Sequence, residues 1–141
     1  MKTKIVLLAL LISASTVQNI LPQEIVSGQK PFDYFGQVPP ENTVEIFAPG
    51  IISDIVKDAC ALAISPNGDE VFLSTGGWPR TKIMYMKKMG DKWSLPDTAI
   101  FSKDCWATEP AFSPDGRYLY YSSSKGKTDI NDYSLWRIKK T

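Results

Sequence analysis

Two copies of one turn motif limit most strongly what this 141-residue chain can fold into: Ser65-Pro66-Asn67-Gly68 and Ser113-Pro114-Asp115-Gly116. They lie in two similar segments, residues 63–75 and 111–123, which are 48 residues apart. Proline sets φ for the first central position of a type I turn, Asn or Asp suits the next position, and Gly can adopt the left-handed conformation that follows. Such a turn closes a β-hairpin with a bulge. Two copies in register therefore predict two hairpins of a repeat architecture, with Gly116 at positive φ.

The strands that follow these turns are apolar at consecutive positions, Val71-Phe72-Leu73 and Leu119-Tyr120-Tyr121. A strand of this kind is expected where a sheet is covered on both faces. In an antiparallel fold, the stacked blades of a propeller provide such cover. A β-sandwich that contains two unrelated turns is the alternative.

Candidate strands can be placed around both turns from runs of apolar and β-branched residues bounded by Gly, Pro and Asp. In the first repeat they are residues 60–65, 70–75, 82–87 and a weaker strand near 98–101, and in the second 108–113, 118–123 and 134–139. A further strand is expected at residues 44–47, before Pro49-Gly50.

Residues 111–123, followed by Leu135-Trp136-Arg137-Ile138, resemble the WD-like β-propeller repeat of exported bacterial proteins, which is also found in TolB. Residues 44–53 are similar to the segment that leads into the first blade of such proteins. The resemblance covers about residues 38–141 and implies an all-β fold of four-stranded antiparallel blades.

The resemblance divides the chain into an outer strand at 44–53, a first blade at 57–101 and a second blade at 102–141 that lacks its outer strand. A propeller ring takes four to eight blades. About two blades are present, so the ring is expected to be incomplete.

The N-terminus predicts a secretory signal peptide over residues 1–18. Lys2 and Lys4 precede an apolar run at residues 5–12, and Ser13-Ala14-Ser15 offers a cleavage pattern of small residues. The run is shorter than the roughly 20 residues that span a bilayer, so no stable membrane span is expected after cleavage. A buried N-terminal helix is the alternative. The protein is therefore expected to be exported, periplasmic or secreted, with an irregular lead-in at residues 19–43.

The charge and the composition exclude several functions. Without residues 1–18 the chain carries 14 basic and 15 acidic residues, which does not favour nucleic-acid binding. The sequence contains no His, so it lacks the usual base of Ser-His-Asp and Cys-His sites and the commonest zinc ligand. No catalytic residue, metal site or cofactor is therefore expected; the alternative is catalysis by two paired carboxylates, which needs no His.

Cys60 and Cys105 are the only cysteines. In an exported chain they could form a disulfide, or they could be two buried free thiols. Asp129, Asn131 and Asp132 offer the alternating oxygen ligands of a calcium loop, but the Gly and distal Glu of an EF-hand are absent, which favours a polar loop.

Four residues are candidates for ligand binding: Asp58, Asp104, Trp106 and Glu109. They lie near the starts of the innermost strands of the two repeats, which in a propeller would place them around one mouth of the central channel. Aromatic and polar groups together suit a sugar or a peptide. The alternative is that these residues cap turns, pack between sheets or are solvated.

These observations predict a non-enzymatic binding or scaffolding module with a protein, peptide or glycan partner. The alternative is part of an enzyme, or an enzyme-associated domain, that acts on polysaccharide or peptide. The fold does not choose between them.

Overall fold

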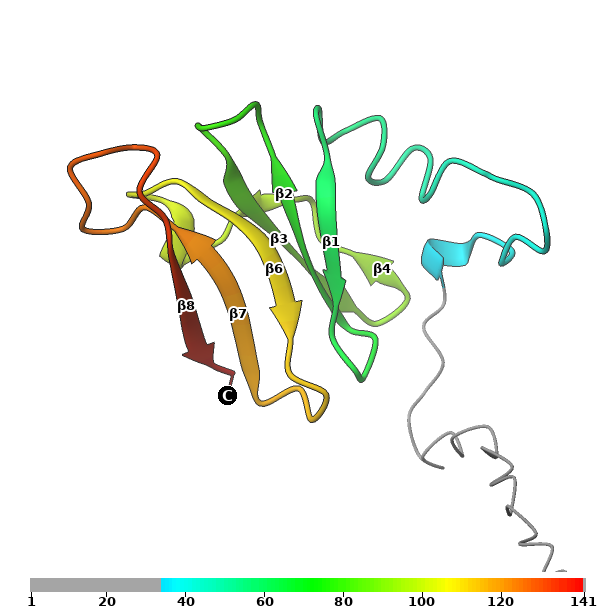
Figure 1. Cartoon of the computed structure of the whole chain (residues 1–141). Helices are drawn as coiled ribbons and strands as arrows, with labels where there is room; N and C mark the ends of the chain where they lie inside the picture. The colour runs from blue at the N-terminus through cyan, green and yellow to red at the C-terminus, as the bar shows by residue number, and fades with distance from the viewer. Residues whose placement is uncertain (1–33, 141) are drawn as a thin grey trace, which may run out of the picture.

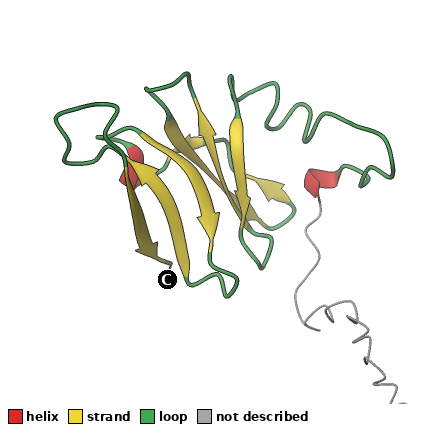
Figure 2. Ribbon diagram, viewed as in Figure 1, coloured by secondary structure: helices red, strands yellow, loops and turns green. Residues whose placement is uncertain are grey.

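The computed structural model describes residues 34–140 (Figures 1 and 2). This part of the chain contains eight short strands and two single-turn 3₁₀ helices, joined by loops and turns. The elements are η1 (Tyr34–Gly36), β1 (Cys60–Ile64), β2 (Glu70–Thr75), β3 (Lys82–Met89), β4 (Lys92–Trp93), β5 (Asp97–Thr98), η2 (Ile100–Ser102), β6 (Ala107–Phe112), β7 (Tyr118–Ser123) and β8 (Ser134–Lys139). The expected all-β fold class is confirmed, and the main strands form where the sequence predicts them.

The strands make two antiparallel sheets that are not closed on themselves. In the first sheet the order is β1-β2-β3-β4, and β5 also pairs with β3. The second sheet has the order β6-β7-β8. Apart from β5, which skips β4 to pair with β3, each strand pairs with the next one along the chain, so the hairpins are local.

Both Ser-Pro-Asx-Gly segments close hairpins, between β1 and β2 and between β6 and β7. The N–H of Gly68 donates to the Ser65 carbonyl oxygen, and the N–H of Gly116 donates to that of Ser113, each at 2.8 Å. Gly68 has φ 73° and Gly116 has φ 69°. The two predicted hairpins and the positive φ of Gly116 are therefore confirmed.

A β-bulge is repeated as well. The register of β1 shifts between Cys60 and Leu62, and that of β6 shifts between Thr108 and Ala111. The residues at the bulges, Ala61 and Glu109, have positive φ, 48° and 56°. They are 48 residues apart in the sequence, so the bulge belongs to the repeat.

The two sheets stack on each other. We call the face of each sheet that is turned toward the preceding part of the chain its back face, and the opposite face its front face. The front face of the first sheet packs against the back face of the second, and Figure 1 shows the green first sheet between the yellow-to-red second sheet and the cyan residues before it. The buried residues of this contact include Ala63, Phe72 and Ile83 from the first sheet and Ala107, Leu119 and Tyr121 from the second.

A second apolar cluster lies on the back face of the first sheet. Val71, Leu73 and Met86 of the sheet are covered there by residues of the segment 48–56, namely Ala48, Ile52 and Val56. The first sheet is thus buried on both faces, as the consecutive apolar residues of β2 predict.

The strand predicted within residues 44–53 does not form. Val44 and Ile46 are exposed, and Ala48 has φ 47°, a conformation outside a regular strand. The Gln37 side chain donates to the Ile46 carbonyl oxygen and accepts from the Ala48 N–H, each at 2.9 Å. Turns beginning at Ala48 then continue the chain. Because these backbone groups are satisfied locally, the segment lies over the first sheet as turns.

The weaker strand predicted near 98–101 is also different in the structure. β5 ends at Thr98, and the 3₁₀ helix η2 follows. The Ser102 hydroxyl accepts the N–H of Ile83 at 2.9 Å, so a side chain occupies the place of a backbone partner of β3.

Both cysteines are free thiols, and the expectation that they would be buried is wrong. Cys60 is exposed, and Cys105 is half-buried. The predicted signal peptide, residues 1–18, and most of the predicted lead-in lie outside the described residues. Among residues 34–140, the structure contains no helix with the length and apolar character needed to cross a membrane.

Candidate functional site

A cavity of about 440 Å³ opens at the end of the second sheet where β6 begins and β7 leads into β8. One wall is formed by residues 103–106, just before β6. The opposite wall comes from the loop between β7 and β8 and includes Ser124, Lys127 and Thr128. The cavity therefore lies between a strand start and a hairpin loop, a place where residues can vary without disturbing the sheet.

Lys82, at the start of β3, holds the first of these walls. Its Nζ donates to the carbonyl oxygens of Ser102, Lys103 and Cys105, each at 2.8 Å. It also lies 4.7 Å from the centroid of the Trp106 ring, within the range of a cation–π interaction. An ammonium group has three donors, so all of its hydrogen bonds go to the backbone of this wall. Lys82 therefore holds the backbone of residues 102–105 in place and puts a positive charge against the Trp106 ring.

The end of β7 fixes Trp106 from the other side. The Ser123 hydroxyl donates to the Trp106 carbonyl oxygen at 2.8 Å, and the Ser124 N–H donates to the same oxygen at 3.1 Å. The Cys105 thiol donates to the Phe101 carbonyl oxygen at 3.3 Å, and its sulfur lies 3.3 Å from the Ser123 hydroxyl oxygen. The indole is consequently held on a wall whose backbone is bound at several points.

The loop between β7 and β8 is ordered by its own polar residues. Lys127 and Asp132 form an ion pair at 3.1 Å. Asp129 Oδ1 accepts the N–H of Asn131 at 2.9 Å. Over residues 34–140, no group of three or more His, Cys, Asp or Glu side chains is arranged to hold a metal ion. These contacts hold the loop as a polar turn.

The structure brings together two of the four residues predicted to bind a ligand. Asp104 and Trp106 both line the cavity, whereas Asp58 and Glu109 do not. Asp58 is exposed in the turn before β1. Glu109 lies at the bulge inside β6, where its N–H donates to the Ser74 hydroxyl at 2.9 Å and its Oε2 accepts from Ser122 at 3.2 Å. The bulge, which the sequence analysis did not detect, accounts for the separate position of Glu109.

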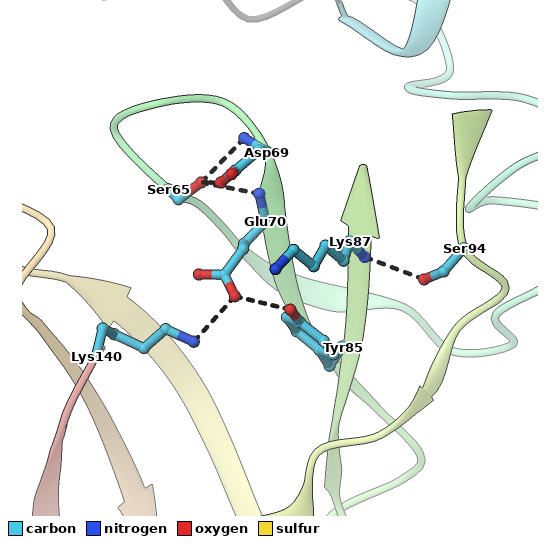
Figure 3. Close-up of polar contacts among 7 residues, drawn as sticks. All are labelled: Ser65, Asp69, Glu70, Tyr85, Lys87, Ser94 and Lys140. Atoms are coloured by element: carbon cyan, nitrogen blue, oxygen red, sulfur yellow. Dashed lines mark hydrogen bonds and ion pairs between the residues drawn. The ribbon is translucent and has the colours of Figure 1, made fainter. Parts of the chain in front are cut away.

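A second polar cluster joins the end of β8 to the first sheet (Figure 3). Glu70 Oε1 accepts from the Tyr85 hydroxyl at 2.7 Å and from Lys140 Nζ at 3.1 Å. The Lys140 ammonium also lies 4.8 Å from the centroid of the Phe72 ring. The side chains of Lys140 and Glu70 are only 21% and 18% exposed. The cluster is thus a shielded ion pair between two sheets.

The chemistry of this cluster favours structure over catalysis. Burial, together with the hydrogen bond and the charge of Glu70, raises the pKa of the Tyr85 phenol well above its usual range. A phenol of this kind keeps its proton at neutral pH, whereas a general base needs a pKa near the working pH. Glu70 and Lys140 are 70 residues apart in the sequence, and no motif in the sequence could have paired them.

No match results when the chain is compared with protein-family models, with curated proteins and with solved structures.

Proposed function

We propose that this chain is a non-enzymatic binding module whose two sheets are successive blades of a TolB-like β-propeller. Three features support the assignment to propeller blades: the repeated turn, the repeated bulge, and the stacking of front face on back face. The apolar run behind Lys2 and Lys4 supports an exported protein, either periplasmic or secreted.

The observation that carries the binding function is the cavity beside Trp106. The Lys82 ammonium lies against the indole, Ser123 binds the main-chain carbonyl oxygen of Trp106, and Ser124 and Thr128 line the same cavity. An aromatic ring beside a few polar residues suits a ligand with both apolar and polar sides, such as a glycan or a peptide segment of a protein. We take the function to be recognition because the cavity combines an aromatic ring with several polar side chains, as binding sites do.

Titration calorimetry of the full chain with oligosaccharides and with unstructured peptides tests this function. We expect one of these two classes to bind, and we expect Trp106→Ala to weaken binding at least tenfold, or about 1.4 kcal/mol. Trp78→Ala is the control for loss of a tryptophan that stacks on Tyr133 of the loop between β7 and β8 but does not line the cavity. Equal effects of the two substitutions, or turnover of the ligand, would contradict the proposal.

Export has a separate test. The intact mass of the protein recovered from the periplasm or the medium is expected to lack the N-terminal segment. Recovery with Met1 and the apolar run still attached would contradict this part of the proposal.

A further inference from the structure

The front face of the second sheet repeats part of the front face of the first. Four corresponding pairs of positions carry residues that are identical or similar in shape and polarity: Ala63 with Ala111, Phe72 with Tyr120, Ser74 with Ser122, and Ile83 with Leu135. Two other pairs on these faces differ, Tyr85 with Arg137 and Glu70 with Tyr118. The surroundings of the two faces also differ, because Ile83 is 0% exposed and Leu135 is 76% exposed.

The first sheet shows what covers such a face. Its front face is packed against the back face of the second sheet, which presents Ala107, Leu119 and Tyr121. The contact extends to the turns, where a Cβ atom at Gly116 would lie 3.2 Å from Cδ of Pro66. One sheet of the repeat is therefore a close fit for the next.

A hydrogen bond sets the position of this contact. Ser74 is fully buried, and its hydroxyl oxygen accepts the backbone N–H of Glu109 at 2.9 Å. Glu109 is the residue at the bulge of β6, with φ 56°. The bulge thus directs a backbone donor of the second sheet at a hydroxyl group of the first, which also accepts from the Thr108 hydroxyl at 3.3 Å.

Ser122 is the residue of the second sheet that corresponds to Ser74. Its side chain is half-exposed, and its hydroxyl donates to the Glu109 carboxylate of its own sheet at 3.2 Å. Tyr120 is also half-exposed, and Ala111 is exposed. Within residues 34–140, this face keeps the pattern of a contact surface while its apolar residues stay accessible to water.

We propose that the front face of the second sheet, formed by Ala111, Tyr120, Ser122 and Leu135, is a docking surface for a third sheet of the same repeat. The back face of that sheet carries an aliphatic and an aromatic residue in the places of Leu119 and Tyr121. Its first strand carries a bulge whose N–H binds the Ser122 hydroxyl. This inference rests on the stacked repeats of the proposed function and is independent of the cavity beside Trp106.

A second copy of this chain does not offer such a sheet. The back face of its first sheet is covered by Ala48, Ile52 and Val56, and the back face of its second sheet is covered by the first. Two copies could meet only through other surfaces. The occupant that matches the chemistry of the face is a further repeat.

The test extends the full chain by a copy of residues 88–140, joined after Lys139. This junction keeps the repeat in register, because Lys87 and Lys139 pair with Glu70 and Tyr118, the first residues of β2 and β7. Ser122→Ala is then introduced into the original and the extended chains, and thermal unfolding is measured. We expect a fall in Tm on the order of 5 °C in the extended chain and little change in the original chain. Ser74→Ala, the matched control, lowers Tm in both.

Three results would overturn the proposal. The first is an equal effect of Ser122→Ala in the two chains. The second concerns proteolysis of the added unit. The proposal would be overturned if a protease digested the added unit as fast as a variant of that unit with lysines in the places of Leu119 and Tyr121. A dimer of the original chain that Leu135→Lys dissociates would also count against it, since the occupant would then be a second copy. Ligand binding beside Trp106 is measured separately, so failure of the two proposals can be told apart.

Discussion

The first and second sheets share one repeat but differ in how many of their faces are covered. The first lies between the segment 48–56 and the second sheet, whereas the second is covered on its back face alone among the described residues. Ile83 and Leu135 occupy corresponding places, yet the first is fully buried and the second is 76% exposed. The residue type at a repeat position therefore shows which contact the side chain is able to make. Whether that contact forms depends on the presence of a neighbouring sheet.

The largest expected difference between the sheets comes from this pair. Ile83→Ala removes buried methyl and methylene groups and leaves a cavity, so the free energy of unfolding should fall by about 2–5 kcal/mol. Leu135→Ala should change it by about 0.5 kcal/mol or less, because the side chain is exposed. Chemical denaturation of the two variants measures both values. Equal losses would show that the front face of the second sheet is covered in solution.

The ion pair between the sheets is expected to have the next largest effect. Lys140→Met leaves the shielded Glu70 carboxylate without its cation, which should cost about 1–3 kcal/mol in the free energy of unfolding. Lys139→Met is the control, since Lys139 is exposed and lies next in the chain. If the two variants are equally stable, the pair does not hold the sheets together.

Gly116 lies in a turn that touches the other sheet, whereas a Cβ at Gly126 would meet no neighbouring atom. Substitutions at these two glycines therefore measure what the contact between turns contributes. Both have positive φ, 69° and 73°, so a Val at either position is strained by about 1 kcal/mol or more. At Gly116 the new Cβ would also lie 3.2 Å from Pro66, whereas at Gly126 it would meet nothing within 4 Å. Gly116→Val should therefore be the more destabilising in thermal unfolding.

A further substitution separates the two causes. In a chain that already carries Pro66→Ala, the difference between Gly116→Val and Gly126→Val should become smaller. An unchanged difference would mean that contact between the turns is not its source.

The smallest expected effect concerns the two turns, where Asn67 of the first corresponds to Asp115 of the second. Hydrogen bonds from the Ser113 hydroxyl and from Arg117 lower the pKa of Asp115 from 3.8 to about 2. A carboxylate with a lowered pKa in the folded state stabilises the fold above about pH 4. This contribution is lost as the pH falls from about 4 to 2.

Unfolding titrations between pH 5 and pH 2 test this contribution. Asp115→Asn, which gives the second turn the residue of the first, should reduce the loss of stability in that range. An identical pH dependence in the two proteins would contradict the assigned hydrogen bonds.

The sequence by itself determined the local structure of this protein. The turns at Gly68 and Gly116 and the strands beside them could be predicted, because φ preferences and strand propensity depend on neighbouring residues. Asp104 and Trp106 were also predicted to lie close together, since they are two residues apart before one strand. The strand expected at 44–47 was wrong, because a strand needs a partner edge and the Gln37 side chain satisfies that backbone instead.

Only the tertiary structure decided how these local parts meet. The bulge at Glu109 bonds to Ser74 of the other sheet, the Lys82 ammonium binds three carbonyl groups of a distant segment, and Glu70 pairs with Lys140 across 70 residues. These contacts depend on which sheet faces lie against each other. Face-to-face packing is set by the shape and burial of whole sheets, which no local pattern of residues encodes.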